Sequence, residues 1–509
     1  MSQSSVVVAE RPGTGTPRPY DFPAVDRTTL ANGLRIGVAT MPGRQLVSAS
    51  LVIRYGAGDE EPELGGATVL AARAMTEGTE SYDAIELVEA SERLGASIHA
   101  EAGWDATSIG VDVPAARLSR ALELIAEVAR RPTFPDAEVD RLREERLNDI
   151  LQARADPRRR AEEAFIGTIY SESSPYHRPA AGSRETVERL TAADLRRVFA
   201  QATDPSRTAL LVGGELDPSE VIAAAERLFG DWGPDGAASV SRPDDSGIVD
   251  QRFVKVVHRP GAVQTEIRIG HPSVPRHNPD FHALSVLGAI LGGLFSSRLN
   301  MKLREEKGYT YGASAGFDMR RGRGPFAARA AVNTEVTVPA TADSMAELER
   351  IRRAPVTEAE LKAARDFLIG VFPLRFETPG PVVGSLGALF IHELPDDELH
   401  RYRAGIEAVT RDDVLRVATE HIRPDKAAIV LVGDADAFGR DLEAAGFGRL
   451  VIERDEGPAV EGPIAPQAEQ TGPVDSGEPG PTEGAEGPDV DGTEEAAKRA
   501  EPSRTDPTR

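Results

Sequence analysis

The segment RRPTFPDAEVDRL at residues 130–142 has a counterpart in RRAPVTEAELKAA at residues 352–364, at an offset of 222 residues. Two further pairs follow in the same order: LTAADLRRV at 190–198 with VTRDDVLRV at 409–417, and SRTALLVGGELDP at 206–218 with DKAAIVLVGDADA at 425–437. One such pair arises by chance, whereas three collinear pairs at a nearly constant offset indicate an internal duplication. We therefore predict two related domains, residues 25–232 and 253–452, joined by a linker at residues 233–252.

The periodicity within each half predicts strands and helices rather than a single class of element. In the first half, apolar residues alternate over 33–40 and 46–56, as expected for strands, and an amphipathic helix is predicted over 83–95. A hairpin-like pair at 96–113 precedes two long helices, and the last strand of each half is a short apolar run that ends at glycine. This order predicts an α+β class, with each domain an antiparallel sheet that has helices on one face.

Charge and composition limit the classes of function. The 509 residues have a net charge of −23, and residues 455–509 hold 14 acidic and 4 basic residues, a net of −10. That stretch has 17 glycines and prolines and no aromatic residue, so we predict an acidic disordered tail over 453–509 and a shorter disordered tail over 1–24. An acidic chain with no basic stripe argues against nucleic-acid binding.

Cysteine usage and apolar runs add further expectations. The chain has no cysteine, which excludes disulfides, thiolate zinc sites and a cysteine nucleophile. No continuous apolar run reaches the roughly 18 residues that span a bilayer, so no membrane partner is expected. The N-terminal residues have neither a basic start nor a long apolar stretch, and we expect a cytoplasmic protein.

Several motifs together resemble one known family. The segments LANGLRIGV (30–38), IRYGAGDE (53–60), EGTESYDA (77–84) and ASERLGASIHA (90–100) resemble the N-terminal domain of insulinase, or pitrilysin-type, peptidases, and LGAILGGLFSSRLNMKLREEKGYTYG (287–312) resembles the glycine-rich segment of their C-terminal domain. The resemblance covers about residues 25–450. It implies that the two domains form half of a clamshell around a peptide.

The zinc motif of that family is degenerate in this chain. The family carries H-x-x-E-H on the helix after the GAGDE-like loop, with two histidines on one helical face as ligands and a glutamate that activates the bound water. Here the five positions are Val69, Leu70, Ala71, Ala72 and Arg73, and no other H-x-x-E-H or H-E-x-x-H occurs. The resemblance therefore implies that this chain binds no metal and does not hydrolyse peptides alone. Zinc is expected in a partner subunit.

The position of the family's third ligand carries an acid of a different length. That ligand is a glutamate roughly 75 residues further on, and a count of 76 residues beyond Arg73 reaches Asp149. We hypothesise that the Arg73 guanidinium occupies the vacated metal position and pairs with the Asp149 carboxylate. In the alternative, Arg73 turns outward to solvent.

The second half retains residues that the resemblance assigns to substrate binding. In two-chain members of the family, the subunit without zinc supplies an arginine and a tyrosine seven residues apart, and Arg304 and Tyr311 have that spacing. Arginine offers charged donors to a substrate carbonyl, and a tyrosine hydroxyl can donate to a developing oxyanion. In the alternative, Arg304 pairs with Glu305 or Glu306 and Tyr311 is an ordinary strand aromatic, while Tyr309 competes for the same strand face.

These observations lead to one main hypothesis and two alternatives. The chain is interpreted as the non-zinc subunit of a heterodimeric peptidase that closes with an H-x-x-E-H subunit around an extended peptide. It would contribute substrate binding and transition-state stabilisation through Arg304 and Tyr311. The first alternative is a catalytically inactive scaffold or peptide-binding protein with the same fold, and the second, an independent peptidase with unconventional ligands, is disfavoured by the missing ligands.

Overall fold

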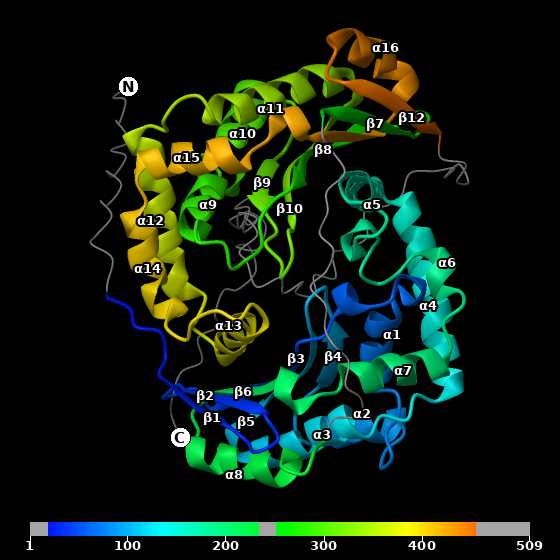
Figure 1. Ribbon diagram of the computed structural model, residues 1–509, viewed down its shortest axis with the longest axis vertical. Helices are drawn as coiled ribbons and strands as arrows, with labels where there is room; N and C mark the ends of the chain where they lie inside the picture. The colour runs from blue at the N-terminus through cyan, green and yellow to red at the C-terminus, as the bar shows by residue number, and fades with distance from the viewer. Residues whose placement is uncertain (1–18, 234–250, 455–509) are drawn as a thin grey trace, which may run out of the picture.

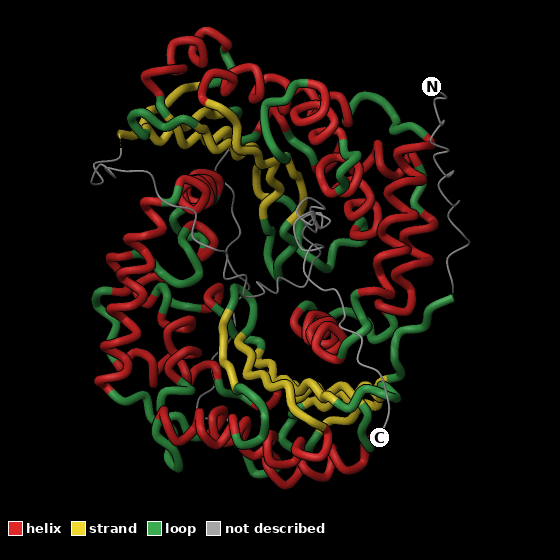
Figure 2. Tube along the Cα trace, turned by 180° about the vertical axis from the view of Figure 1, so that it is seen from behind, coloured by secondary structure: helices red, strands yellow, loops and turns green. Residues whose placement is uncertain are grey.

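Two six-stranded sheets form the framework of the molecule and lie at opposite ends of it (Figures 1 and 2). The computed structural model describes residues 19–233 and 251–454. The strands of the first sheet are β1 (Val25–Thr29), β2 (Arg35–Thr40), β3 (Leu46–Ile53), β4 (Ile98–Ala102), β5 (Thr107–Pro114) and β6 (Thr208–Gly214). Those of the second sheet are β7 (Phe253–His258), β8 (Gln264–Pro272), β9 (Ala313–Phe317), β10 (Pro325–Asn333), β11 (Ala428–Gly433) and β12 (Arg449–Arg454).

The strand orders show the duplication directly. The first sheet runs β1-β2-β6-β3-β5-β4 and the second β12-β7-β11-β8-β10-β9, so five strands occupy equivalent places. The sixth differs, because β1 precedes its neighbour in the chain and pairs antiparallel with it, whereas β12 comes last and pairs parallel with β7. The predicted α+β class and duplication are confirmed. The sheets are mixed rather than wholly antiparallel, since β2–β6 and β7–β11 are also parallel pairs.

Sixteen α-helices connect and cover the strands of the described residues. In the first half these are α1 (Ala67–Ala74), α2 (Ala84–Glu92), α3 (Leu118–Arg130), α4 (Asp136–Ala155), α5 (Pro157–Ile169), α6 (Arg184–Val187), α7 (Ala192–Ala202) and α8 (Pro218–Phe229). In the second half they are α9 (Phe281–Gly288), α10 (Arg298–Asn300), α11 (Thr337–Ile351), α12 (Glu358–Leu374), α13 (Pro379–Ile391), α14 (Glu398–Ala408), α15 (Arg411–His421) and α16 (Ala435–Ala445). Both α4 and α12, and both α5 and α13, begin 222 residues apart.

Local sequence signals explain where the repeated helices begin. Thr191 and Thr410 are the N-caps of α7 and α15, and each forms a capping box with an aspartate three residues on. Both α5 and α13 have proline at their first position, where the missing N–H costs no helical hydrogen bond. The repeated segments therefore repeat their start signals as well as their apolar pattern.

The two domains exchange a helix, which the sequence did not predict. Helix α5 belongs to the first half of the chain but packs on β8 and β11 of the second sheet, and α13 of the second half packs on β3 and β6 of the first sheet (Figure 1). Phe165 of α5 is fully buried with Val257, Val430 and Val432 of the second sheet. In the reciprocal contact, Leu386 and its neighbours on α13 share a core with residues of the first sheet.

This exchange covers the second face of each sheet. Helices α3 and α8 pack on the outer side of the first sheet, and α11 and α16 do so on the second. The predicted arrangement, with helices on one face only, is therefore incomplete, because the exchanged helix lies on the other face. All residues of β6 and β11 are buried, as expected for central strands covered on both sides.

One described stretch, Phe281–Glu306, is long and apolar enough to cross a membrane by length and composition. It comprises α9, α10 and two π-helical segments, η6 (Ala289–Gly293) and η7 (Met301–Glu306). Of its apolar window, 61% is buried inside the second domain, which is the behaviour of a core helix.

The predicted tails and linker lie largely outside the described residues. Where they overlap, the structure shows packing: Phe22, within the tail predicted over 1–24, is buried against Phe376 of the second domain, with ring centroids 5.0 Å apart. Glu453, within the tail predicted over 453–509, is part of β12. The remaining residues of these segments, 1–18, 234–250 and 455–509, are not described.

Candidate functional site

The loop before α1 is built around a buried glutamate. Glu60 is 7% exposed and accepts a hydrogen bond from the backbone N–H of Gly66 at 2.9 Å and another from that of Thr68. Burial raises the pKa of Glu60 to about 7, against the opposing effect of those two hydrogen bonds. Gly66 has a φ of 95°, and a Cβ at this position would lie 2.8 Å from the Ala181 carbonyl oxygen. The start of α1 is thus fixed by an acidic cap and an obligatory glycine.

The H-x-x-E-H positions on α1 do not fit a zinc ion. Ala72 is 1% exposed and Val69 is half-buried, so these two positions contribute packing. Neither side chain has a donor atom, and the third position is the cation Arg73. Zinc requires imidazole, thiolate or carboxylate ligands, and we derive no metal-dependent step for this domain.

Arg73 pairs with a carboxylate, but not with the one that the spacing suggested. Its Nη2 lies 2.9 Å from Glu145 Oε2, one turn earlier on α4 than Asp149, and this corrects the predicted Arg73–Asp149 pair. Arg141 joins the same group, with contacts to Glu145 at 2.5 Å and Glu77 at 2.7 Å. The side chains of Arg73 and Glu145 are 41% and 44% exposed, so solvent screens the pair. A chain of alternating charges therefore includes Arg73, the last position of the degenerate H-x-x-E-H motif.

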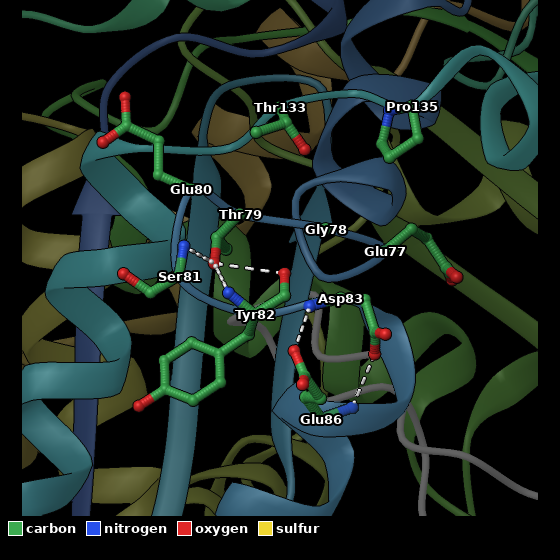
Figure 3. Close-up of a pocket in the computed structure, with 10 residues that line it drawn as sticks. All are labelled: Glu77, Gly78, Thr79, Glu80, Ser81, Tyr82, Asp83, Glu86, Thr133 and Pro135. Atoms are coloured by element: carbon green, nitrogen blue, oxygen red, sulfur yellow. Dashed lines mark hydrogen bonds between the residues drawn. The ribbon is translucent and has the colours of Figure 1, made fainter.

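A shallow acidic depression lies beside this network. Figure 3 shows its walls, with the capping box between Asp83 and Glu86 and the contacts of Thr79 drawn as dashed lines. Its volume is about 270 Å³, and it is lined by Glu77, Gly78, Thr79, Glu80, Ser81, Tyr82, Asp83, Glu86, Thr133 and Pro135. Its hydrogen-bonding groups serve the local fold: Thr79 Oγ1 accepts from two backbone N–H groups, and Arg141 binds Glu77. We assign no chemistry to it.

The second domain presents Arg304 and Tyr311 at its surface. Arg304 lies in η7, and a π-helical turn is an uncommon conformation that recurs at functional sites. Its guanidinium lies 4.7 Å from the ring centroid of Phe295 and 3.5 Å from Glu305, so the predicted surface ion pair is present together with an aromatic contact. Tyr311 is 91% exposed.

The local backbone separates Tyr311 from Tyr309. Neither residue lies in a strand, because β9 begins at Ala313, so the alternation argument that placed them on one strand face fails. Tyr309 is half-buried against the core of the second domain, and its N–H bonds the Leu303 carbonyl at 2.8 Å. Tyr311 is therefore the tyrosine that is free to meet a ligand.

A basic turn that the sequence reasoning missed joins the two domains. Between β9 and β10, Arg321 contacts Asp59 of the GAGDE loop at 2.9 Å, and its N–H bonds the Asp105 carboxylate at 2.9 Å. Arg320 lies 4.8 Å from the ring centroids of both Trp104 and Tyr176. The sequence feature that could have predicted this contact is the presence of a basic turn, MRRGRG at 319–324, together with an acidic loop, IRYGAGDE at 53–60.

Two groups of histidine and carboxylate side chains elsewhere have ligand-like spacing in the described residues. In the first, His258 Nδ1 accepts the Ala435 N–H at 3.1 Å and Asp436 binds Arg454. In the second, Asp280 binds both Arg416 and His421. Each group is engaged in protein contacts, and we assign a metal to neither.

Comparison with known proteins agrees with this geometry. The family described as Insulinase (Peptidase family M16) matches residues 36–180, and that described as Peptidase M16 inactive domain matches residues 189–368. A zinc protease of Mycobacterium tuberculosis (strain H37Rv) is 25% identical over 405 residues, which covers 80% of this chain and 92% of the relative. A zinc protease of Streptomyces coelicolor is 25% identical over 446 residues, covering 86% and 94%.

Solved structures share the fold. A peptidase M16 inactive domain from Pseudomonas fluorescens superposes with a TM-score of 0.75 at 24% identity and covers 81% of this chain and 98% of its own. A protease from Helicobacter pylori gives a TM-score of 0.76 at 20% identity, covering 81% and 100%. The fold and the degenerate helix thus define a two-domain peptidase framework without its metal ligands. The chain belongs to the insulinase family of peptidases, family M16.

Proposed function

We propose that this chain is the non-zinc subunit of a heterodimeric insulinase-type metallopeptidase. The observation that carries the proposal is the state of Tyr311: it is 91% exposed, and within the described residues its hydroxyl has no recorded hydrogen bond. An exposed tyrosine contributes little packing to the fold, whereas its ring and hydroxyl suit contact with a peptide that arrives from outside, and Arg304, seven residues earlier, is also exposed.

Each residue has a defined part in the proposed reaction. Arg304 donates from its guanidinium to a carbonyl of the bound peptide and orients the scissile bond. The Tyr311 hydroxyl donates to the oxyanion as the carbonyl is attacked, where the developing charge is greatest. The partner subunit, with an intact H-x-x-E-H, holds the zinc that supplies the attacking water. Both residues of this chain would therefore act in trans.

The experiment requires the purified chain and a candidate partner that carries H-x-x-E-H. We expect this chain alone to bind no stoichiometric zinc and to leave a peptide library intact, and the mixture to cleave it in a chelator-sensitive manner. Tyr311→Phe should lower the rate of the pair about 10- to 1000-fold, the scale of losing one oxyanion donor. Tyr309→Phe is the matched control and should leave the rate near that of the wild type, because Tyr309 packs on the core.

Two results would reject the proposal. Unchanged turnover in Tyr311→Phe, with assembly intact by gel filtration, would remove the residue from the reaction. Zinc binding and peptide cleavage by this chain alone would show that it is a peptidase in its own right, despite the missing H-x-x-E-H residues.

A second function, peptide binding without hydrolysis, is favoured by the free edge of the first sheet. Strand β4 is an edge strand whose residues are half-buried or exposed, and it lies against α1. Its counterpart β9 is obstructed by η6, since a Cβ at Gly292 would lie 2.0 Å from the Ala315 nitrogen. A peptide added to β4 would gain main-chain hydrogen bonds but would meet no metal ligand on α1. Peptide affinity that persists without any partner, and that falls on Ala100→Pro in β4, would support this function over the first.

A further inference from the structure

A basic surface forms where α4 ends and α5 begins. It comprises Arg154, Arg158, Arg159, Arg160, Lys255 and Arg259. The Arg259 guanidinium joins its parts, since it donates to the carbonyls of Arg154 at 3.2 Å and Ala155 at 2.8 Å. Arg154, Arg158 and Arg159 are exposed. The surface therefore gathers six cations, three of them in the first turn of α5, where the helix dipole disfavours positive charge.

Few acids in the described residues offset these cations. Asp156 lies 3.8 Å from Arg159, but its carboxylate also caps α5 through the Arg158 and Arg159 N–H groups. No ion pair is recorded for the Arg154 or Arg158 side chain among residues 19–233 and 251–454. Glu185 lies close enough to Arg154 to interact with its charge, and Glu453 binds Arg160 and Lys255. With Asp156, these acids are still fewer than the six cations of the basic surface.

The chain itself leads an acidic segment to this surface. Strand β12, which has no counterpart in the first domain, ends at Arg454, and its Glu453 already binds the basic surface through Arg160 at 2.6 Å and Lys255 at 2.7 Å. The residues that follow, 455–497, contain 12 acidic and no basic side chains. Charge complementarity and the point at which the chain leaves β12 both identify the same occupant.

We propose that the acidic segment 455–497 docks on the basic surface and continues the contact that Glu453 begins. Guanidinium–carboxylate pairs provide the attraction, and many different acidic residues of the segment can form them. Salt weakens the attraction because the arginines of the surface are exposed. The tether raises the local concentration of acid at the surface without requiring a unique register. Docking would shield the start of α5 from other polyanions.

Two spin labels on the full chain test the proposal, and the absence of native cysteine makes the labelling specific. One label is placed at Asp475→Cys in the segment and the other at Gln152→Cys, an exposed position on the last turn of α4. Ala444→Cys, an exposed position in the last turn of α16, replaces Gln152→Cys in the control pair. An undocked coil of 21 residues from Arg454 to 475 would spread over roughly 25 Å.

Double electron–electron resonance then gives the distance distributions. We expect a short, narrow Gln152–Asp475 population at low salt that disappears at 1 M salt and in the double variant Arg158→Glu, Arg159→Glu, while the Ala444 pair stays broad. Charge reversal at two exposed arginines around the end of α11, Arg350→Glu within the helix and Arg353→Glu just after it, should leave the population intact.

Two outcomes would overturn the proposal. Gln152 and Ala444 distributions that match at low salt would show that the segment has no preference for the basic surface. A short population that survives both salt and reversal at 158 and 159 would show that something other than these charges holds it. If the reversed variant fails to fold by circular dichroism, the salt series on the parent pair decides alone.

Discussion

Replacement of Phe165 by alanine should destabilise the whole chain, although this residue packs outside its own domain. The side chain is 0% exposed and lies on α5 among buried residues of the second sheet. Its ring reaches the backbone of that sheet, since a Cβ at Gly270 would lie 2.9 Å from Phe165 Cζ. Truncation of a fully buried phenylalanine costs about 3–5 kcal/mol. We expect a loss of that size in the free energy of unfolding.

The exchange of helices makes the consequence distinctive. Trp232 packs in the core of the first domain, whereas Trp104 packs against the cluster that contains Phe165. In a Trp104→Phe background, intrinsic fluorescence therefore reports on the first domain, whereas far-ultraviolet circular dichroism reports on both domains. If the exchanged helices couple the domains, urea should unfold the wild type in one transition that both signals share. Phe165→Ala should then move both midpoints together. Leu386→Ala on α13, the reciprocal contact, should do the same.

The matched control is Phe229→Ala, a fully buried phenylalanine of α8 that packs within the first domain. Phe229→Ala should lower the free energy of unfolding by a similar amount, and it should shift the fluorescence midpoint because packing is lost within the first domain itself. The coupling argument is wrong if Phe165→Ala splits the circular dichroism transition and leaves the tryptophan midpoint at its wild-type value. Large chains often unfold in several steps, so a single shared transition is a demanding expectation.

Three further predictions concern the two halves of the site. Burial raises the pKa of Glu60 from 4.5 to about 7, so between these pH values the folded chain holds a proton on Glu60 that the unfolded chain has released. The contribution of Glu60 to the free energy of unfolding should therefore fall as pH rises from about 4.5 to about 7. Urea titrations at several pH values should show this dependence in the wild type and its loss in Glu60→Gln. Gly66→Ala should destabilise more than Gly43→Ala in the same assay, because both have positive φ but only a Cβ at 66 meets neighbouring backbone; equal losses would refute this. Phe295→Leu should lower kcat/KM of the proposed heterodimer about 2- to 5-fold by releasing Arg304, the scale of an exposed cation–π contact, while Phe295→Tyr should leave kcat/KM unchanged.

Much of the fold was predictable because its signals are local. The capping threonines of α7 and α15, the prolines that open α5 and α13, and the buried central strands are each encoded within a few residues. The helix exchange was not predictable in this way. The apolar face of α5 shows that the helix is buried, but the two sheets offer similar surfaces, and nothing in the periodicity says which one receives it.

The site shows the same limit at the scale of one helical turn. Counting from Arg73 reached Asp149, and the actual partner is Glu145, four residues earlier on α4. Residues four apart lie on the same helical face, so facing direction could not separate them, and the remaining difference is an axial rise of about 6 Å. Resolving it requires the angle and offset at which α1 crosses α4. The basic turn around Arg321 was missed for a related reason, since its partner Asp59 is 262 residues away.

The two domains differ in the residues that occupy their expected functional positions. In the first domain Glu60 caps the start of α1 and Ala72 is buried at its centre, while the positions of the H-x-x-E-H motif pack or form an ion pair. An exposed pair such as Arg73–Glu145 contributes at most about 1 kcal/mol, so stability gives little reason to keep it, and packing is what holds the helix. In the second domain, Tyr311 contributes almost no packing, and the guanidinium of Arg304, seven residues earlier in the chain, lies against the Phe295 ring. Tyr311 packs little while Arg304 is held in position, and we propose that a bound peptide accounts for both features. We therefore propose that the second half of the chain provides its contacts with substrate.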